Sequence, residues 1–205
     1  MNRRYALTGL LFAAAAAFAQ VPAAGQDGWV VLFDGKNLDN FNKIGDANWR
    51  IEDGSVVADK GNGFLVTKND YGDFQLRAEF WVGPDANSGI FIRATDPEKL
   101  TATNGYEVNI WDDRPEKDYG TGAIVGVAKV DPMPRATGQW NTYEITAKGG
   151  TFTIVLNGKK TVEGTDTKHA KGRIGLQHGL GNKDAAGVVN DKGVVKFRKV
   201  EIKTL

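Results

Sequence analysis

The stretch DFQLRAEFWV, residues 73–82, alternates apolar and polar side chains along almost its whole length. Successive side chains of a β-strand point to opposite faces of a sheet. This alternation therefore predicts a strand with one face in a core and the other in solvent. The predicted core face carries Phe74, Leu76, Ala78, Phe80 and Val82.

Short segments of the same kind lie on both sides of this stretch, and glycine-rich turns separate them. The chain has 26 glycines in 205 residues, nearly double the usual share of about 7%. Gly149-Gly150 and Asn157-Gly158 each stand between alternating segments and predict hairpin turns. The other predicted strands are residues 49–52, 55–58, 88–94, 105–112, 122–129, 143–148, 151–156, 159–163, 173–178 and 194–203.

Beyond residue 19 the chain shows no helical apolar period over ten or more positions. Roughly ten to twelve short strands with regular turns predict a single all-β domain, either a sandwich or a barrel. Two connections, residues 95–104 and 179–193, are long for such a fold. Loops of this length often form functional rims, and mobile surface decoration is the open alternative.

Residues 1–19 have the features of a cleavable export signal. Arg3 and Arg4 precede an alanine-rich apolar run, and Ala17-Phe18-Ala19 offers the small-x-small pattern that signal peptidase cuts. The run is shorter than the roughly 20 residues of a membrane-spanning helix. The chain also has no cysteine to carry a lipid anchor. We therefore expect a periplasmic or secreted protein that begins at Gln20 and leaves the membrane after cleavage.

The amino-acid composition excludes several classes of binding partner and of chemistry. The absence of cysteine excludes disulfides and thiol chemistry. Without Arg3 and Arg4 the mature chain carries 24 basic and 25 acidic side chains, which argues against nucleic acid as a partner. The sequence has no His-Glu-x-x-His helix, no phosphate-binding glycine loop and no Gly-x-Ser-x-Gly turn. We expect an uncharged or small partner and no cofactor, and the oligomeric state stays open.

The predicted strand 105–112 has the most distinctive polar face. Glu107, Asn109 and Trp111 share this face, and apolar side chains take the other. A flat indole on which a sugar ring can stack, beside polar groups that bind hydroxyls, is typical of a carbohydrate site. The alternative is a solvated sheet face with one exposed tryptophan. We favour the site, because a large indole is seldom left in solvent without a use.

Arg93 extends this polar face from the preceding strand. It lies on the side of strand 88–94 that is opposite the isoleucines, so we expect it beside Glu107. One interpretation is a cross-strand ion pair that only satisfies both charges. The other is a base with an adjacent cation that stabilises a developing oxyanion.

The predicted strand 173–178 adds an amide and an imidazole. Gln177 lies on its polar face, and His178 ends the strand. A histidine at a strand end is more often a surface or capping residue than a catalyst. His178 is nevertheless the better of the two candidate histidines, since His169 lies in a charged loop.

Acidic residues near this strand limit the chemistry. A retaining glycosidase needs two carboxylates about 5–5.5 Å apart. On a single strand this requires acids at positions i and i+4, but the residue four places after Glu107 is Trp111. Two-carboxylate hydrolysis is therefore disfavoured.

A group of acidic residues follows the same strand: Asp112, Asp113, Glu116 and Asp118. These acids could hold calcium, although a solvated loop fits their spacing better.

A series of short motifs occurs in order along the chain: Val31-Leu32-Phe33-Asp34-Gly35-Lys36-Asn37-Leu38, Asn48-Trp49-x-x-x-Asp53-Gly54, Asp73-Phe74-x-Leu76, Asn87-Ser88-Gly89-Ile90-Phe91-x-Arg93, Gly105-Tyr106-Glu107-Val108, Thr121-Gly122-Ala123-Ile124, Gly138-x-Trp140-Asn141, Leu156-Asn157-Gly158, Gly172-x-Ile174-Gly175-Leu176-Gln177 and Phe197-Arg198. This ordered set resembles the 3-keto-disaccharide hydrolase family, long described as a domain of unknown function. The similarity covers residues 29–205 and leaves residues 20–28 as a short lead. The chain departs from the family pattern at Val125, where many relatives have tyrosine, and at Asn109, where many have glutamine.

The resemblance implies a two-sheet jelly-roll sandwich of the concanavalin A type that acts on sugars oxidised at C3. In this family the ketone acidifies the hydrogen at C2, a base removes it, the C1 substituent leaves, and water adds later. One base and one oxyanion stabiliser are sufficient for such an elimination. The alternatives are a non-catalytic carbohydrate-binding module and a structural domain of the cell envelope.

Seven residues are the candidates for these roles. Glu107 would be the base or a hydrogen-bonding acid, Arg93 the stabiliser of the enolate or of a substrate oxygen, and His178 a proton shuttle. The candidates for substrate binding are Asn109, Trp111, Gln177 and Asp112.

Overall fold

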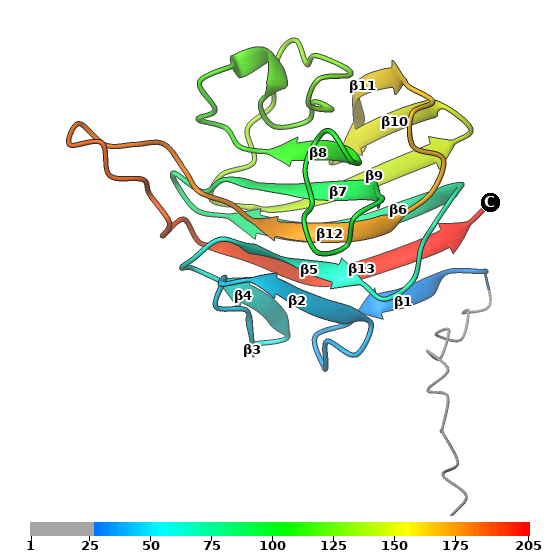
Figure 1. The fold of residues 1–205 in the computed structure, drawn as a ribbon, viewed down its shortest axis with the longest axis horizontal. Coiled ribbons are helices and arrows are strands. Elements are labelled where there is room, and N and C mark those ends of the chain that lie inside the picture. Colours follow the sequence, from blue (N-terminus) through cyan, green and yellow to red (C-terminus); the bar gives the residue numbers. More distant parts are fainter. Residues whose placement is uncertain (1–26) are drawn as a thin grey trace, which may run out of the picture.

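The computed structural model describes residues 27–205, and the predicted signal peptide lies outside the described residues. Its strands form two antiparallel sheets (Figure 1). The larger sheet has the order β11-β10-β9-β6-β13-β4-β3, with β1 paired to β13. The smaller sheet has the order β2-β5-β12-β7-β8. An all-β two-sheet sandwich is therefore confirmed.

The larger sheet contains β1 (Val30–Phe33), β3 (Arg50–Glu52), β4 (Ser55–Ala58), β6 (Phe74–Val82), β9 (Trp140–Lys148), β10 (Thr151–Leu156), β11 (Lys159–Thr165) and β13 (Val195–Thr204). The smaller sheet contains β2 (Phe41–Gly45), β5 (Gly63–Thr67), β7 (Ser88–Ala94), β8 (Tyr106–Ile110) and β12 (Arg173–His178). A single 3₁₀ turn, η1 (Lys117–Tyr119), is the helical element of the described residues. None of the helical structure in residues 27–205 has the length and hydropathy that a membrane crossing requires.

The alternation of residues 73–82 forms the centre of the larger sheet. In β6 the predicted core side chains are buried, and their neighbours are partly or fully exposed. The turn between β10 and β11 also follows the sequence, because Asn157 and Gly158 both have positive φ, 51° and 78°. This is the backbone that an Asn-Gly hairpin turn requires.

Residues 122–129 differ from the prediction, because they do not form a strand. They make isolated bridges, Val108 with Ile124 and Ile124 with Ala128, around a turn. The segment still covers the free edge of β8, since Val125 N donates to Glu107 O at 3.0 Å and Asn109 N donates to Ala123 O at 3.0 Å. The short strands β1, β2 and β5 are absent from the sequence prediction.

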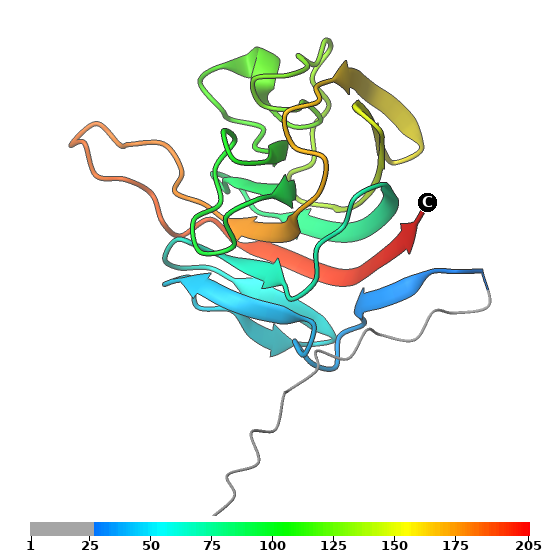
Figure 2. The ribbon, with the colours of Figure 1, turned by 45° about the vertical axis from the view of Figure 1, so that its right-hand side comes forward.

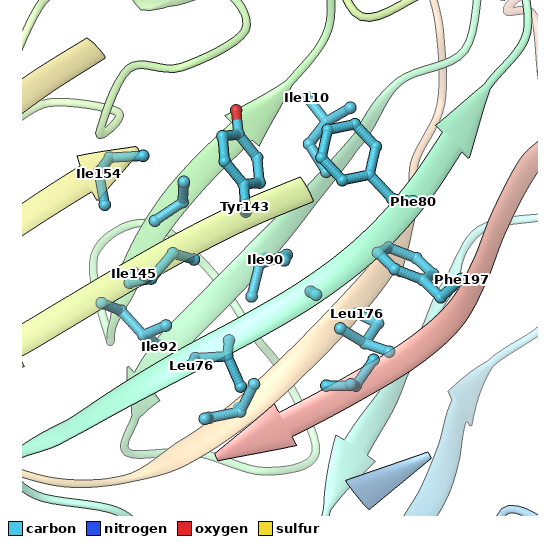
Figure 3. Packing of buried hydrophobic residues seen from close by; sticks show 14 of the residues in the cluster. Leu76, Phe80, Ile90, Ile92, Ile110, Tyr143, Ile145, Ile154, Leu176 and Phe197 are labelled. Atoms are coloured by element: carbon cyan, nitrogen blue, oxygen red, sulfur yellow. The ribbon is translucent and has the colours of Figure 1, made fainter. Parts of the chain in front are cut away.

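One hydrophobic cluster fills the space between the sheets (Figure 3). Phe80, Tyr143 and Phe197 come from the larger sheet, and Ile90 and Leu176 come from the smaller one. Tyr143 also ties the sheets by a hydrogen bond, in which its hydroxyl donates to Asn109 O of β8 at 2.7 Å. The core therefore fixes which face of the smaller sheet points outward.

Two long loops lie on or next to the outward face of the smaller sheet. Residues 95–104, between β7 and β8, cross in front of β12 (Figure 1) and bring Leu100 onto a small apolar cluster with Val66 and Phe91. Residues 179–193, between β12 and β13, project beyond the end of the sandwich (Figure 2). We call this segment the 179–193 hairpin, since Lys183 pairs with Val189 within it.

Candidate functional site

The outer face of β12, β7 and β8 holds the candidate site, and we call it the site face. Strand pairing places Phe91 opposite Glu107 and Gly89 opposite Asn109. A Cβ atom at Gly89 would lie 3.1 Å from Glu107 Oε1. The glycine therefore leaves space in which the Glu107 carboxylate can turn inward over the sheet.

Glu107 is an almost buried acid on this face, with 8% of its surface exposed. Burial raises its pKa to about 7, and the positive charge of Arg114 opposes this rise. No hydrogen bond from residues 27–205 contributes to the pKa of this carboxyl group. A carboxyl group in this state can exchange a proton near neutral pH, as a general acid or base must.

Other polar atoms on the site face are buried and have no hydrogen-bond partner within residues 27–205. These atoms are Gln177 Oε1, Trp111 Nε1, Arg114 Nε and Asn87 Oδ1. Asn87 and Gln177 are adjacent, because a Cβ at Gly179 would lie 2.9 Å from Asn87 Nδ2 and 3.2 Å from Gln177 Cδ. Buried polar groups are normally hydrogen-bonded, so unpartnered groups gathered on one face indicate a ligand site.

Arg114 is a candidate site residue that sequence reasoning missed. Its guanidinium carbon lies 5.7 Å from the Trp111 ring centroid, and its charge acts on Glu107. Its side chain is only 17% exposed, and Nη2 is 3.1 Å from Glu116 Oε2. Arg114 follows the end of β8 in an irregular loop, so no periodicity could assign it to a face. Its only sequence signal is its position three residues after Trp111.

Arg93 does not lie beside Glu107, and this corrects the sequence prediction. Its φ of 51° is left-handed, and the pairing of β12 with β7 shifts register at this point. The side chain, 1% exposed, turns to the sandwich edge and lies over the Phe152 ring. Its guanidinium donates to Gly72 O at 2.9 Å, Gly149 O at 2.7 Å, His169 O at 3.3 Å and Asp73 Oδ1 at 2.9 Å. Arg93 thus holds loops together, away from the site face.

His178 is also displaced from the predicted site. It is fully buried, opposite in direction to Gln177, and packs edge-on against Trp49 with ring centroids 6.4 Å apart. Its Nδ1 lies 2.8 Å from Gly61 O and its Nε2 lies 2.7 Å from Gly193 O. The imidazole therefore joins the β4–β5 turn to the base of the 179–193 hairpin, and its position does not favour a proton shuttle.

The side chains of Asn109 and Asp112 are occupied by structural hydrogen bonds. Asn109 lies under η1, where Nδ2 donates to Tyr119 O at 2.6 Å and Oδ1 accepts from Ile110 N at 3.0 Å. The Asp112 side chain is 1% exposed and points inward. Its carboxylate accepts hydrogen bonds from Thr121 Oγ1, Ala136 N, Thr137 N and Thr137 Oγ1. Neither side chain is positioned to bind a sugar hydroxyl.

The acids considered for calcium do not converge. Asp113 lies 3.9 Å from Lys117 Nζ, Asp118 lies 3.0 Å from Lys129 Nζ, and Glu116 pairs with Arg114. Within residues 27–205 no group of three or more His, Asp or Glu side chains is arranged to hold a metal ion. The geometry thus offers no donor set for a metal at the site face.

The fold and the site face together define a jelly-roll protein whose candidate site holds a buried acid and unpartnered polar groups. The family profile of the 3-keto-alpha-glucoside-1,2-lyase-like domain matches residues 28–203. The chain belongs to this family, as the sequence motifs indicate, and is glycosyl-hydrolase-like.

Individual relatives agree with this assignment. A 3-keto-disaccharide hydrolase of Bacteroides thetaiotaomicron is 25% identical over 170 residues, which cover 67% of this chain and 58% of the relative. The chain therefore spans a little over half the length of that curated relative. A putative glycosyl hydrolase of Parabacteroides distasonis has 29% identity and a TM-score of 0.67, covering 86% of this chain and 99% of that one. A second one from the same organism has 22% identity and a TM-score of 0.71, covering 87% and 94%, and shows the shared fold.

Proposed function

We propose that the protein cleaves 3-keto-glycosides by elimination, with Glu107 as the base. The observation that carries this proposal is the Glu107 carboxyl group, whose pKa of about 7 feels the charge of Arg114, on a face that also holds unpartnered polar groups. The named activity of the Bacteroides relative supports the substrate class. Sugars of this kind carry a ketone at C3, which makes the C2 hydrogen acidic enough for one carboxylate to remove.

Each step of the elimination is assigned to a residue of the site face. The Glu107 carboxylate accepts the proton from C2, and the electron pair moves to the C3 oxygen. The guanidinium of Arg114 stabilises the resulting enolate, as a fixed cation does most effectively in a partly buried site. As the ketone re-forms, the C1–O bond breaks, and protonated Glu107 returns a proton to the departing oxygen. Water then adds to the unsaturated sugar.

The remaining polar groups orient the substrate along the site face. Gln177 Oε1 and Asn87 Oδ1 accept hydrogen bonds from sugar hydroxyls, and Trp111 Nε1 donates to one. Each of these atoms is buried without a partner, so a hydroxyl that reaches it restores a hydrogen bond and gains affinity.

The electrostatics of Glu107 support elimination over ordinary retaining hydrolysis. A second carboxylate about 5–5.5 Å away, as that mechanism requires, would raise the pKa of Glu107 through charge repulsion. Only burial and the Arg114 charge act on this pKa in the described residues. A lone base fits a substrate whose own ketone provides the activation.

Turnover of 3-keto-trehalose by the mature chain, followed as release of glucose, tests the proposal. Wild type should release glucose, and Glu107→Gln should lose at least about 100-fold in kcat, the scale of a general base. Unmodified trehalose is the control, because without the ketone its C2 hydrogen is not acidic. Equal turnover by Glu107→Gln, or cleavage of trehalose itself, would overturn the assignment. Sugar binding without turnover would favour a binding module instead.

We also propose that the protein acts outside the cytoplasm, on the strength of residues 1–19. Amino-terminal sequencing of protein from the periplasm and medium should begin at Gln20. A chain retained in the cytoplasm with Met1 in place would contradict this.

A further inference from the structure

A cavity of about 280 Å³ opens at the start of β12, the end of this strand that is opposite the 179–193 hairpin (Figure 1). We call it the Arg173 cavity. Its volume is close to the lower end of the range for small-molecule sites. Three charged side chains and two residues of the loop between β7 and β8 contribute to its lining: Asp70, Lys171, Arg173, Thr95 and Pro97.

Leu100 separates the Arg173 cavity from the polar groups at the other end of β12. The core side chains of this strand alternate with Arg173, Gly175 and Gln177, which therefore point outward. A Cβ atom at Gly175 would clash with Leu100 Cδ2, so Leu100 fills the space between the other two side chains. Arg173 and Gln177 are four residues apart, which is about 13 Å along an extended strand. The cavity therefore lies apart from the unpartnered polar groups beside Gln177.

The guanidinium of Arg173 is only partly used by its protein partners. Its side chain is 26% exposed, and Nε lies 2.8 Å from Asp70 Oδ1. Nη1 donates to Thr67 O in a long hydrogen bond of 3.4 Å, and Nη2 forms no hydrogen bond within residues 27–205. A guanidinium with a free nitrogen can donate to an oxygen of a carboxylate or phosphate group, which is the chemistry for which arginine is best suited.

Lys171 gives the cavity an excess of positive charge. It is exposed, lies two residues before Arg173 and forms no ion pair within the described part of the chain. Asp70 is the one acid among the lining residues in this part of the chain, so two cations face a single carboxylate. The acids of the loop between β7 and β8, Asp96 and Glu98, are not part of the lining. The charge of the cavity therefore favours an anion over a neutral ligand.

The backbone around both cations is held in place before any ligand binds. Gly172 lies between them and exchanges two hydrogen bonds with Tyr71, at 2.8 and 3.1 Å. A Cβ atom at Gly172 would clash with Ala94 O, so the chain passes closely against β7 at this point. Thr95 N donates to Asn104 O at 2.8 Å and closes the loop that forms the other wall. A cavity that is already formed binds a ligand without first ordering a segment.

We propose that the Arg173 cavity is a binding site for a small anion, which it holds by a carboxylate or phosphate group through Arg173 Nη2 and Lys171 Nζ. A free inorganic anion, a sugar acid and a sugar phosphate all carry such a group. The inference does not depend on the proposed reaction, because no residue of the cavity takes part in it. The site gives the protein a means to bind acidic sugars more tightly than neutral ones, at a distance from Glu107.

Titrations of the mature chain at constant ionic strength test the site, with glucose 6-phosphate, glucuronate, inorganic phosphate and neutral glucose as ligands. Each anion should shift the backbone amide signals of residues 94–96 and 171–173 to saturation, and glucose should leave these signals unchanged. Tighter binding of the sugar anions than of inorganic phosphate assigns the site to acidic sugars, and equal binding assigns it to the anionic group alone. Both results support the proposal. The absence of a saturable shift with every anion, or an equal shift with glucose, would overturn it.

Two variants test the assigned donors in the same titrations. Lys171→Gln removes an exposed cation, and Arg173→Lys keeps a positive charge beside Asp70 but removes Nη2. Each should weaken binding of the anion about tenfold, as the loss of one charge-assisted hydrogen bond does. Lys159→Gln, at an exposed position on β11, is the matched control and should bind as wild type does. Wild-type affinity in Lys171→Gln and Arg173→Lys, or an equal loss in Lys159→Gln, would contradict the proposal.

Discussion

At the level of single residues, the proposed base Glu107 lowers the stability of the fold when it is ionised. Its carboxyl group is buried without a hydrogen bond that would stabilise the ionised form, so the folded protein holds the proton more tightly than the unfolded chain does. Such groups are common at sites where proton transfer is needed, because activity selects a pKa that folding alone would not.

Glu107→Gln should therefore stabilise the protein at alkaline pH. Folding takes up a proton at Glu107 between about pH 4.5 and 7, so wild-type stability falls as the pH rises through this window. The variant lacks this dependence, and at pH 8 we expect it to be more stable by up to about 3 kcal/mol. Urea unfolding at pH 4 and pH 8 measures the difference. Glu144→Gln, at an exposed ion pair with Arg77, is the control and should change stability by less than about 1 kcal/mol.

The same pKa predicts the pH profile of activity. The base must be ionised, so kcat/KM for 3-keto-trehalose should rise tenfold per pH unit below about pH 7 and level off above it. Initial rates between pH 5 and 8.5 give the profile. A profile that is flat across pH 7 would be inconsistent with Glu107 as the base.

Substitutions of Arg93 and Arg114 should have different effects, the first on stability and the second on turnover. Arg93→Gln removes a buried cation from three carbonyl oxygens and Asp73, so we expect a loss of about 3 kcal/mol in unfolding free energy. Arg114→Gln should lower kcat about 100-fold, as loss of an oxyanion stabiliser does, with a stability change below about 1 kcal/mol. Denaturation and turnover of both variants check this. The reverse pattern would restore Arg93 to the site.

At the scale of elements, the site depends on strand register and on glycines that leave space above the sheet. Gly89 lies where β7 passes beside β8, and the Glu107 side chain occupies the volume that a larger residue would take. The free edge of β8 is covered by residues 122–125, which fixes the strand that carries Glu107.

Gly89→Ala should displace the base. The new Cβ would lie 3.1 Å from Glu107 Oε1 and 3.2 Å from its Cγ, so the carboxyl group has to move by a few tenths of an ångström. Because small misplacements of catalytic groups are costly, we expect kcat to fall about tenfold or more. Gly72→Ala is the matched control, since its Cβ would meet no atom closer than 3.8 Å. Equal kcat in both variants would show that the space above Gly89 is not needed.

At the scale of the whole molecule, a continuous core makes the two sheets one cooperative unit. Phe197→Ala empties a fully buried position between the sheets (Figure 3), and we expect a loss of about 3–5 kcal/mol in unfolding free energy. Tryptophan fluorescence and far-ultraviolet circular dichroism should report one coincident transition for both proteins. Val31→Ala, on the surface, should change stability by less than about 0.5 kcal/mol. Two separate transitions would contradict a single domain.

Most of the strands could be predicted from the sequence because alternation over five or more residues has one interpretation. β6, β7 and β12 lie where the pattern places them. The strand prediction for residues 122–129 is wrong, because alternation indicates only an extended chain. A strand also needs a neighbouring strand that pairs with it over its whole length. The short strands β2 and β5 were missed because β2 is largely exposed, and β5 is buried on nearly every residue.

Ordered motifs were sufficient to predict the family and with it the sandwich, and the strand period was sufficient to predict that Glu107 and Gln177 share a face. Which cation lies near that face depends on contacts between distant parts of the chain, which a local pattern does not encode. The left-handed backbone of Arg93 in β7 directs its side chain away from the site face. The irregular loop after β8 places Arg114 near Trp111 and close enough to Glu107 for its charge to act there. The structure also assigned Asn109, Asp112 and His178 to structural contacts, because hydrogen-bond partners far away in the chain determine where a polar side chain points.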